Sequence, residues 1–123
     1  MTKETFEKLE AICKKAWREL ARSGNDSKPD YLDKYKCSCP ACHIADASTS
    51  GYICRVCPID KFRKQAFADR KEYRDYSTSA CLADGQPYQI WWDNWDTTIE
   101  KTAAKEISEL KWTFLAAHKK AEL

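Results

Sequence analysis

The chain has 123 residues, of which 43% are hydrophobic and 33% charged, and its formal net charge is +2. This composition is typical of a small globular domain and excludes a disordered or collagen-like chain. A net charge so close to zero does not by itself indicate nucleic-acid binding. We therefore expect a single domain over residues 1–123, and its three glycines favour helix over an all-β design.

The cysteines and the first residues bear on the compartment in which the protein works. The chain holds seven cysteines, and residues 1–10 are charged and lack the apolar core of a signal peptide. No apolar run approaches membrane-spanning length. We therefore expect a cytoplasmic protein with no membrane partner. In that reducing compartment, clustered cysteine pairs usually bind metal rather than form disulfides.

An amphipathic helix is predicted over residues 1–24. Its apolar residues recur at spacings of three and four, which places them along one face. They are Phe6, Leu9, Cys13, Ala16 and Leu20. Thr2 is a helix-capping residue, and Gly24 is a stop signal. Cys13 lies within the stripe, so we interpret it as a small buried apolar residue and not as a metal ligand.

Two Cys-x-x-Cys pairs carry the strongest chemical signal in the chain. Cys39 and Cys42 form the first pair, Cys54 and Cys57 form the second, and eleven residues separate them. Two intervening residues let the backbone of each pair curl around one ion, so the four sulfurs fit one tetrahedral zinc site. The segment that holds the pairs has few large apolar residues. A metal would supply the stabilisation that so small a core lacks.

Other side chains near the pairs leave the ligand set open. Cys81 can replace one of the four cysteines, and Cys37 and His43 flank the first pair. Two zinc ions would need nearly all the cysteines and a histidine. Four cysteines also bind iron–sulfur clusters, so such a cluster is the alternative to one Zn²⁺ per chain. The cations that we expect to offset the negative charge of the site are those nearest the second pair, Arg55, Lys61 and Arg63.

The metal lobe, with its following helix, is expected to span residues 37–76. The small polar residues from Ala45 to Gly51 predict the tip of a short hairpin. Pro58 suits the first position of a helix, which the apolar periodicity extends to about residue 74. A cysteine knuckle, a hairpin and a helix that begins at the second pair make a treble-clef-like arrangement.

The last part of the chain predicts one long helix over residues 91–121, because neither glycine nor proline interrupts it. Its expected buried stripe consists of Trp92, Trp95, Ile99, Ala103, Ile107, Leu110, Phe114 and Ala117. Trp91 points away from that stripe, and we expect it to pack over the cysteine lobe, with an exposed position as an interface anchor as the alternative. The resulting fold is mainly α, with the long N- and C-terminal helices packed together and the zinc lobe inserted between them in sequence.

The order of these motifs resembles small cysteine-rich proteins encoded by tailed bacteriophages. Those proteins commonly carry Cys-x-x-Cys, then Cys-x-x-Cys-Pro, then a cysteine shortly before Pro-Tyr and an aromatic residue. The corresponding residues here are Cys39 to Cys42, Cys54 to Pro58, Cys81, Pro87-Tyr88 and Trp91-Trp92. The gap after Cys81 is longer than in that pattern. The resemblance implies a phage origin, a host-cytoplasm location and a metal-stabilised fold, and it implies no particular activity.

Two functions fit these features. The first is a zinc-stabilised interaction module, a phage accessory protein that binds a host or phage protein. The alternative is nucleic-acid binding through the basic helix 61–74, in which aromatic residues alternate with cations but acidic neighbours cancel much of the charge. An enzyme is not expected, because four cysteines fill the shell of a zinc ion. The two histidines, His43 and His118, form no catalytic set, and no small-molecule site is evident.

Overall fold

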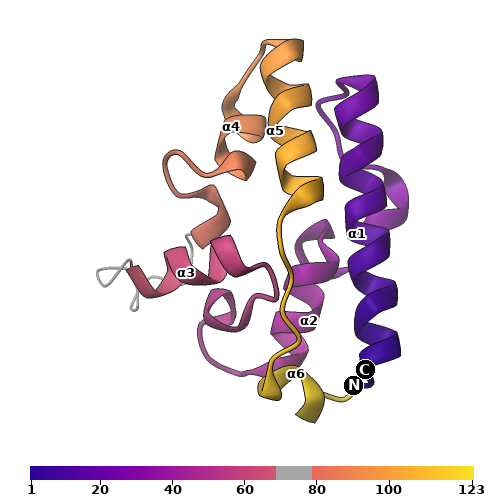
Figure 1. The fold of residues 1–123 in the computed structure, drawn as a ribbon, viewed down its shortest axis with the longest axis vertical. Coiled ribbons are helices and arrows are strands. Elements are labelled where there is room, and N and C mark those ends of the chain that lie inside the picture. Colours follow the sequence, from indigo (N-terminus) through magenta and orange to yellow (C-terminus); the bar gives the residue numbers. More distant parts are fainter. Residues whose placement is uncertain (69–78) are drawn as a thin grey trace.

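The computed structural model describes residues 1–68 and 79–123, which form a mainly α structure without strands among them (Figure 1). The helices are α1 (Lys3–Ser23), α2 (Pro40–Ser48), α3 (Asp60–Ala68), α4 (Pro87–Asp93), α5 (Thr97–Glu109) and α6 (Ala116–Lys120). Short 3₁₀ turns join them: η1 (Asp30–Leu32), η2 (Lys36–Ser38), η3 (Ile53–Val56) and η5 (Ala80–Leu82). The predicted mainly α class is confirmed. In this part of the chain, every helix is too short or too polar to cross a bilayer.

Helix α1 has the caps and the buried face that its sequence predicts. Thr2 Oγ1 accepts the N–H of Thr5 at 3.1 Å, which satisfies one of the free donors of the first turn. At the other end, Gly24 has a φ of 67°, in the left-handed region that favours glycine. A Cβ there would also lie 2.4 Å from Thr97 Cγ2. Glycine therefore both ends α1 and lets α5 approach it.

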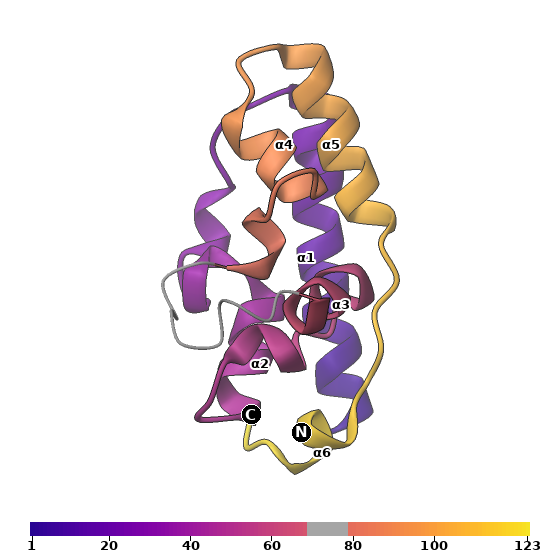
Figure 2. The same ribbon diagram turned by 90° about the vertical axis from the view of Figure 1, so that its left-hand side faces the viewer.

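Helices α1 and α5 lie side by side and antiparallel, and the two views of the fold agree on this (Figures 1 and 2). The buried side chains along the pair come from the predicted stripe of α1 and from Ala103, Ala104 and Ile107 of α5. Alanine at two successive positions of α5 leaves room for the large side chains of α1, such as Trp17. The predicted packing of an N-terminal on a C-terminal helix is confirmed for α1 and α5.

The single helix predicted over residues 91–121 is wrong, because the chain breaks between α4 and α5 and again after α5. Asn94 Nδ2 donates to the Ile90 carbonyl at 3.0 Å and so satisfies an acceptor at the end of α4. Asp96 Oδ1 accepts the Thr98 N–H at 2.8 Å and so caps the start of α5. These side chains stabilise a turn that a continuous helix cannot contain.

This turn reverses the predicted roles of the tryptophans. Trp91 is only 4% exposed, and its ring packs edge-on against Trp17 with 4.9 Å between the centroids. Trp92 and Trp95, which were expected in the core, are 61% and 98% exposed. Ile99 is 42% exposed and does not belong to the core either. The predicted packing of Trp91 is confirmed, and the phase of the C-terminal stripe is wrong before residue 100.

Residues 110–115 are extended instead of continuing α5. An antiparallel bridge pairs Ile59 with Trp112, and the Thr113 N–H donates to the Pro58 carbonyl at 2.9 Å. These backbone contacts tie the segment to the chain just after the second cysteine pair. Periodicity within the segment cannot reveal them, because the partner residues lie far away in the sequence.

The hairpin predicted between the two cysteine pairs is wrong, and the structure describes every residue of that region. Its expected tip, Ala45 to Gly51, lies largely in α2, which begins at Pro40. Proline favours the first position of a helix, so the signal recognised at Pro58 applies equally at Pro40. The treble-clef-like arrangement is therefore not formed. Helix α3 does follow the second pair as predicted, and its expected extension to residue 74 falls outside the described residues.

Candidate metal centre

Both cysteine pairs open onto one cavity of about 520 Å³, here called the cysteine cavity. Its walls carry six of the seven cysteines, namely Cys37, Cys39, Cys42, Cys54, Cys57 and Cys81. Aromatic and aliphatic side chains complete the lining, among them Trp17, Phe62, Tyr88, Trp91 and Ile107. The fold thus brings η2, α2, η3 and η5 together around sulfur, against a wall made by α1, α3, α4 and α5.

The sulfurs share the cavity but do not converge on one point. All seven cysteines are free thiols. Within residues 1–68 and 79–123, no three cysteine, histidine or acidic side chains are grouped closely enough to hold a metal ion. The predicted set of Cys39, Cys42, Cys54 and Cys57 therefore shares one cavity without forming a finished tetrahedral site. It stays a prediction.

The first pair lies at the start of α2. Cys39 precedes the helix and Cys42 lies in its first turn, where free backbone N–H groups favour negative charge. Hydrogen bonds with the thiols of Cys13 and Cys42, assisted by the charge of Lys28 and by the Cys42 N–H, hold the pKa of the Cys39 thiol well below its ordinary value. A sulfur that is readily deprotonated is a good metal ligand. The local geometry thus supports Cys39 as a ligand.

The pKa values of the thiols around Cys39 shift in both directions. The hydrogen bond between Cys13 and Cys39, and then burial, raise the pKa of Cys13 well above its ordinary value. Hydrogen bonds with Cys37 and Cys39 likewise raise the pKa of Cys42, whereas the bond with Cys42 lowers that of the exposed Cys37 to about 6. Negative charge is therefore favoured on Cys37 and Cys39. A metal bound by Cys42 would have to displace its proton, since only thiolates are strong ligands.

The second pair is more deeply buried. Burial raises the pKa of Cys57 well above its ordinary value, and the Ile59 N–H opposes this by donating to the sulfur. Cys54 Sγ accepts the Ala80 N–H at 3.5 Å, which holds the turn that carries Cys81 against the pair. Burial also raises the pKa of Cys81, to about 12. Cys81 therefore lines the same cavity, and its place in the ligand set stays open.

Among the described residues that line the cysteine cavity, Lys28 carries the positive charge. Its Nζ donates to the carbonyls of Cys37 and Ser38 at 3.4 and 3.5 Å and lies 4.6 Å from the centroid of the Tyr88 ring. Burial alone would lower its pKa, but the interactions with Tyr88 and Cys39 raise it. The ammonium thus favours thiolates nearby. No sequence signal identified Lys28, because it comes from the polar connector that follows α1.

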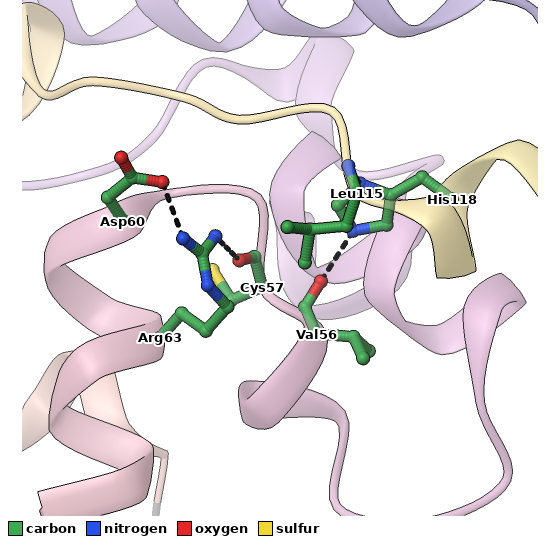
Figure 3. A network of polar contacts seen from close by, with 6 residues as sticks. All are labelled: Val56, Cys57, Asp60, Arg63, Leu115 and His118. Carbon is green, nitrogen blue, oxygen red and sulfur yellow. Dashed lines mark hydrogen bonds and ion pairs between the residues drawn. The ribbon is translucent and has the colours of Figure 1, made fainter.

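The cations that the sequence placed near the site act elsewhere. Arg63 Nη2 pairs with the Asp60 carboxylate at 2.7 Å, and its Nη1 donates to the Cys57 carbonyl at 3.0 Å (Figure 3). Lys61 pairs with Glu106 at 3.7 Å. Arg63 therefore holds the backbone of the second pair and does not interact with its sulfurs. For Lys61 and Arg63, the prediction that they offset the charge of the site finds no contact in its support, and Arg55 lies over the Phe67 ring, 5.5 Å from its centroid.

His118 holds the same backbone from the opposite side (Figure 3). Its Nδ1 accepts the Leu115 N–H at 3.0 Å, so the ring proton lies on Nε2, which donates to the Val56 carbonyl at 2.7 Å. The ring is fully buried and stacks on Phe6 with 5.5 Å between the centroids. Burial, with a smaller contribution from the positive charge of Arg63, lowers its pKa. His118 is thus a structural support of the second pair.

Two other residues considered as metal ligands, His43 and Cys13, lie outside the cysteine cavity. His43 does not line the cysteine cavity, because its Nδ1 accepts the Lys36 N–H at 3.4 Å and its ring packs edge-on against Tyr35. Cys13 is buried in the apolar core, as predicted, and its thiol also interacts with Cys39. The structure therefore favours Cys37 and Cys81 over His43 as alternative ligands.

Comparisons with protein-family models, with curated proteins and with solved structures found no match to this chain. The candidate site therefore rests on its residues and their geometry. Six thiols around one cavity, with backbone N–H groups that donate to sulfur and an ammonium nearby, suit a thiophilic metal. Zinc and an iron–sulfur cluster both meet that description.

Proposed function

We propose that this chain is a zinc-stabilised interaction module that binds a protein and carries out no catalysis. One Zn²⁺ would be held by Cys39, Cys42, Cys54 and Cys57. The observation that carries the proposal is that both pairs line one cavity, although α2 separates them in sequence. A bound ion would supply a covalent-like link between the starts of α2 and α3.

The packing around the second pair supports a structural role for the metal. Cys57 belongs to the main core, whereas Cys54 lies in a separate cluster that consists, among the described residues, of Cys54, Ala66 and Ala80, with Tyr52 and Ile53 partly buried against it. So few apolar atoms offset little of the ordering entropy, about 1–2 kcal/mol per residue. A structural zinc ion contributes on the order of 10 kcal/mol and would decide whether this region is ordered.

The exposed aromatic residues support a role in protein binding. Trp92, Trp95 and Phe67 are 61%, 98% and 55% exposed. Tryptophan is enriched among residues that dominate binding energy at protein interfaces, because it buries a large rigid surface. The resemblance to phage-encoded proteins extends the proposal to a phage accessory protein that binds a host or phage protein in the host cytoplasm.

Nucleic-acid binding through residues 61–74 is supported less well. Of its described cations, Lys61 and Arg63 already pair with acidic side chains, at 3.7 and 2.7 Å, and Lys64 remains. The other cations of that segment, Arg70, Lys71 and Arg74, lie outside the described residues. The described part of the segment therefore gives no specific observation in favour of this function.

Metal content tests the proposal directly. Protein purified in reductant without added metal should show one zinc ion per chain by native mass spectrometry and elemental analysis. The Cys81→Ser variant then decides the ligand set, because retained zinc favours the four predicted cysteines and lost zinc places Cys81 in the shell. Stoichiometric iron, or protein that is folded without metal, would contradict the proposal.

A second measurement tests the interaction. The zinc-loaded protein, immobilised and exposed to host lysate, should retain one partner protein in stoichiometric amount. Protein in which Trp92 and Trp95 are both alanine, but whose zinc content is unchanged, should retain much less. Equal retention by the wild type and this variant would show that the partner does not bind through Trp92 and Trp95. Retention of nucleic acid in place of protein would favour the alternative function.

A further inference from the structure

A second pocket, of about 470 Å³, lies where the end of α1 meets the turn between α4 and α5. It is lined by Gly24, Asn25, Asp26, Trp91, Trp92, Asn94, Trp95, Thr97 and Glu100, and is here called the tryptophan pocket. Its two charged residues, Asp26 and Glu100, are both acidic. The pocket therefore combines negative charge with three indole rings.

Glu100 is the residue that needs an explanation. It is 5% exposed, yet its carboxylate accepts no hydrogen bond and forms no ion pair within the described residues. Its carboxylate oxygens are not among the fully buried polar atoms, so they keep access to solvent through the pocket, and a charged group on a residue so enclosed is normally paired. Lys101, the next residue, lies against Gly24, and it does not line the pocket. The protein thus holds an acceptor in a pocket whose described lining residues include no cation.

The aromatic walls suit the same kind of ligand. Trp92 is 61% exposed and Trp95 is 98% exposed, so their rings are available to a partner. The face of an indole attracts a cation more strongly than the face of any other side chain, and it also stacks on the planar guanidinium group. An anion is disfavoured here, because Asp96 already accepts the first free N–H groups of α5.

We propose that the tryptophan pocket binds an arginine side chain of a partner protein, with the guanidinium group paired to Glu100 and stacked on the exposed indoles. That the partner is a protein rests on the proposed function. That the bound group is a guanidinium rests on the pocket alone. Arginine is favoured over lysine because its planar group can pair with a carboxylate and stack on a ring at once. Asp26, at the rim, adds negative charge.

The isolated ligand group tests the pocket without knowledge of the partner. The ¹⁵N-labelled protein, as purified, would be titrated with N-acetyl-arginine amide, while the indole N–H signals of Trp91, Trp92 and Trp95 are followed by NMR. We expect saturable shifts in the millimolar range, which is reasonable for one small group. N-acetyl-citrulline amide has nearly the same shape without the charge, and should cause no saturable shift. Equal shifts with both compounds, or none with either, would overturn the proposal.

Two substitutions on α5 locate the binding. Glu100→Gln keeps the shape and removes the charge, and should weaken binding of the arginine compound about fivefold or more. Glu109→Gln removes an exposed charge from the same helix and should leave binding unchanged. If Glu100→Gln binds as tightly as the wild type, the carboxylate is not the recognition group and the proposal is wrong. The proposal is also wrong if Glu100→Gln and Glu109→Gln weaken binding equally, because the loss is then not specific to Glu100.

This test is independent of the wider function. A chain that binds zinc and retains a protein partner, but shows no charge-dependent shift, would retain the proposed function and lose the arginine site. A chain that shows the shift but holds no zinc would lose the metal proposal and retain the site. An excess of N-acetyl-arginine amide should also release the captured partner if both proposals hold.

Discussion

The pair formed by α1 and α5 and the region around the cysteine cavity are stabilised in different ways. The helix pair buries regularly spaced apolar side chains, and its contacts need no particular chemistry beyond size and shape. The cavity region is held by sulfur, by backbone N–H groups and by the side chains of Lys28, Arg63 and His118. Periodicity therefore describes the first region well, whereas the second depends on individual atoms contributed by distant segments.

The α1–α5 pair and the region around the cysteine cavity also differ in how much they would depend on a metal. Leu9, Trp17 and Ile107 lie in one continuous core, which reaches the cysteine cavity through Ala41, Ile44 and Cys57. Among the described residues, the buried cluster near Cys54 is small and separate from that core. We therefore expect perturbations of the metal to act on the cavity region first, and perturbations of the apolar stripe to act on the whole fold.

The largest expected effect is that of Cys57→Ser. The variant should lose its zinc, whose contribution is on the order of 10 kcal/mol, and the amide signals of residues 39–57 should lose their dispersion in NMR spectra. Helices α1 and α5 should keep their helical signals, because apolar side chains along both helices pack directly against each other, although Trp17 and Ile107 also line the cysteine cavity. A variant that keeps stoichiometric zinc and a folded lobe would show that Cys57 is not a ligand.

Leu9→Asp and Ile107→Asp should each lower the free energy of unfolding by about 3 kcal/mol, because each places an unpaired charge in the core. Urea denaturation followed by circular dichroism measures the change. Ala11→Asp, at an exposed position of α1, is the control and should change stability little. Wild-type stability in either core variant would place that residue outside the core.

The buried His118 makes the stability of the protein depend on pH. Its pKa is lowered in the fold, mainly by burial, so between the ordinary histidine pKa of about 6.5 and the folded value only the unfolded chain binds the proton. The free energy of unfolding should fall as pH drops through this window, by up to about 1.4 kcal/mol per pH unit.

His118→Gln should remove this slope, and the stability difference between wild type and variant should shrink as pH falls from 7.5 to 5. Taking that difference cancels effects shared by both proteins, such as protonation of cysteine ligands. A difference that is constant over this pH range would show that His118 titrates equally in both states and that its ring is not held neutral by the fold.

Cys13→Ala should have the smallest effect, about 1 kcal/mol, because it removes one buried sulfur from a packed core. Zinc content should stay at one ion per chain, in contrast with Cys57→Ser. The comparison separates a packing cysteine from a ligand. Loss of zinc in Cys13→Ala would mean that the contact between Cys13 and Cys39 is needed for metal binding.

Local signals were sufficient where one element determines its own structure. Thr2, Gly24 and the apolar stripe of α1 predict that helix and its buried face, and the spacing of the cysteines identifies the region that forms the cavity. The signals at Pro40, Asn94 and Asp96 were also local, and they account for the start of α2 and the break before α5. Each could have been found from the sequence with the capping rules applied elsewhere.

Only the tertiary structure decided the rest. The extended path of residues 110–115 depends on backbone hydrogen bonds with Pro58 and on the bridge to Ile59. Lys28 reaches the cysteine cavity because the connector after α1 folds back over it, and Glu100 is buried because α1 and the α4–α5 turn meet around it. The amino-acid sequence by itself determined the apolar face of α1 and the positions of the cysteines that line the cavity. The positions of charges relative to those faces arise from contacts between distant segments, whose energies depend on distance and burial and leave no periodic trace in the chain.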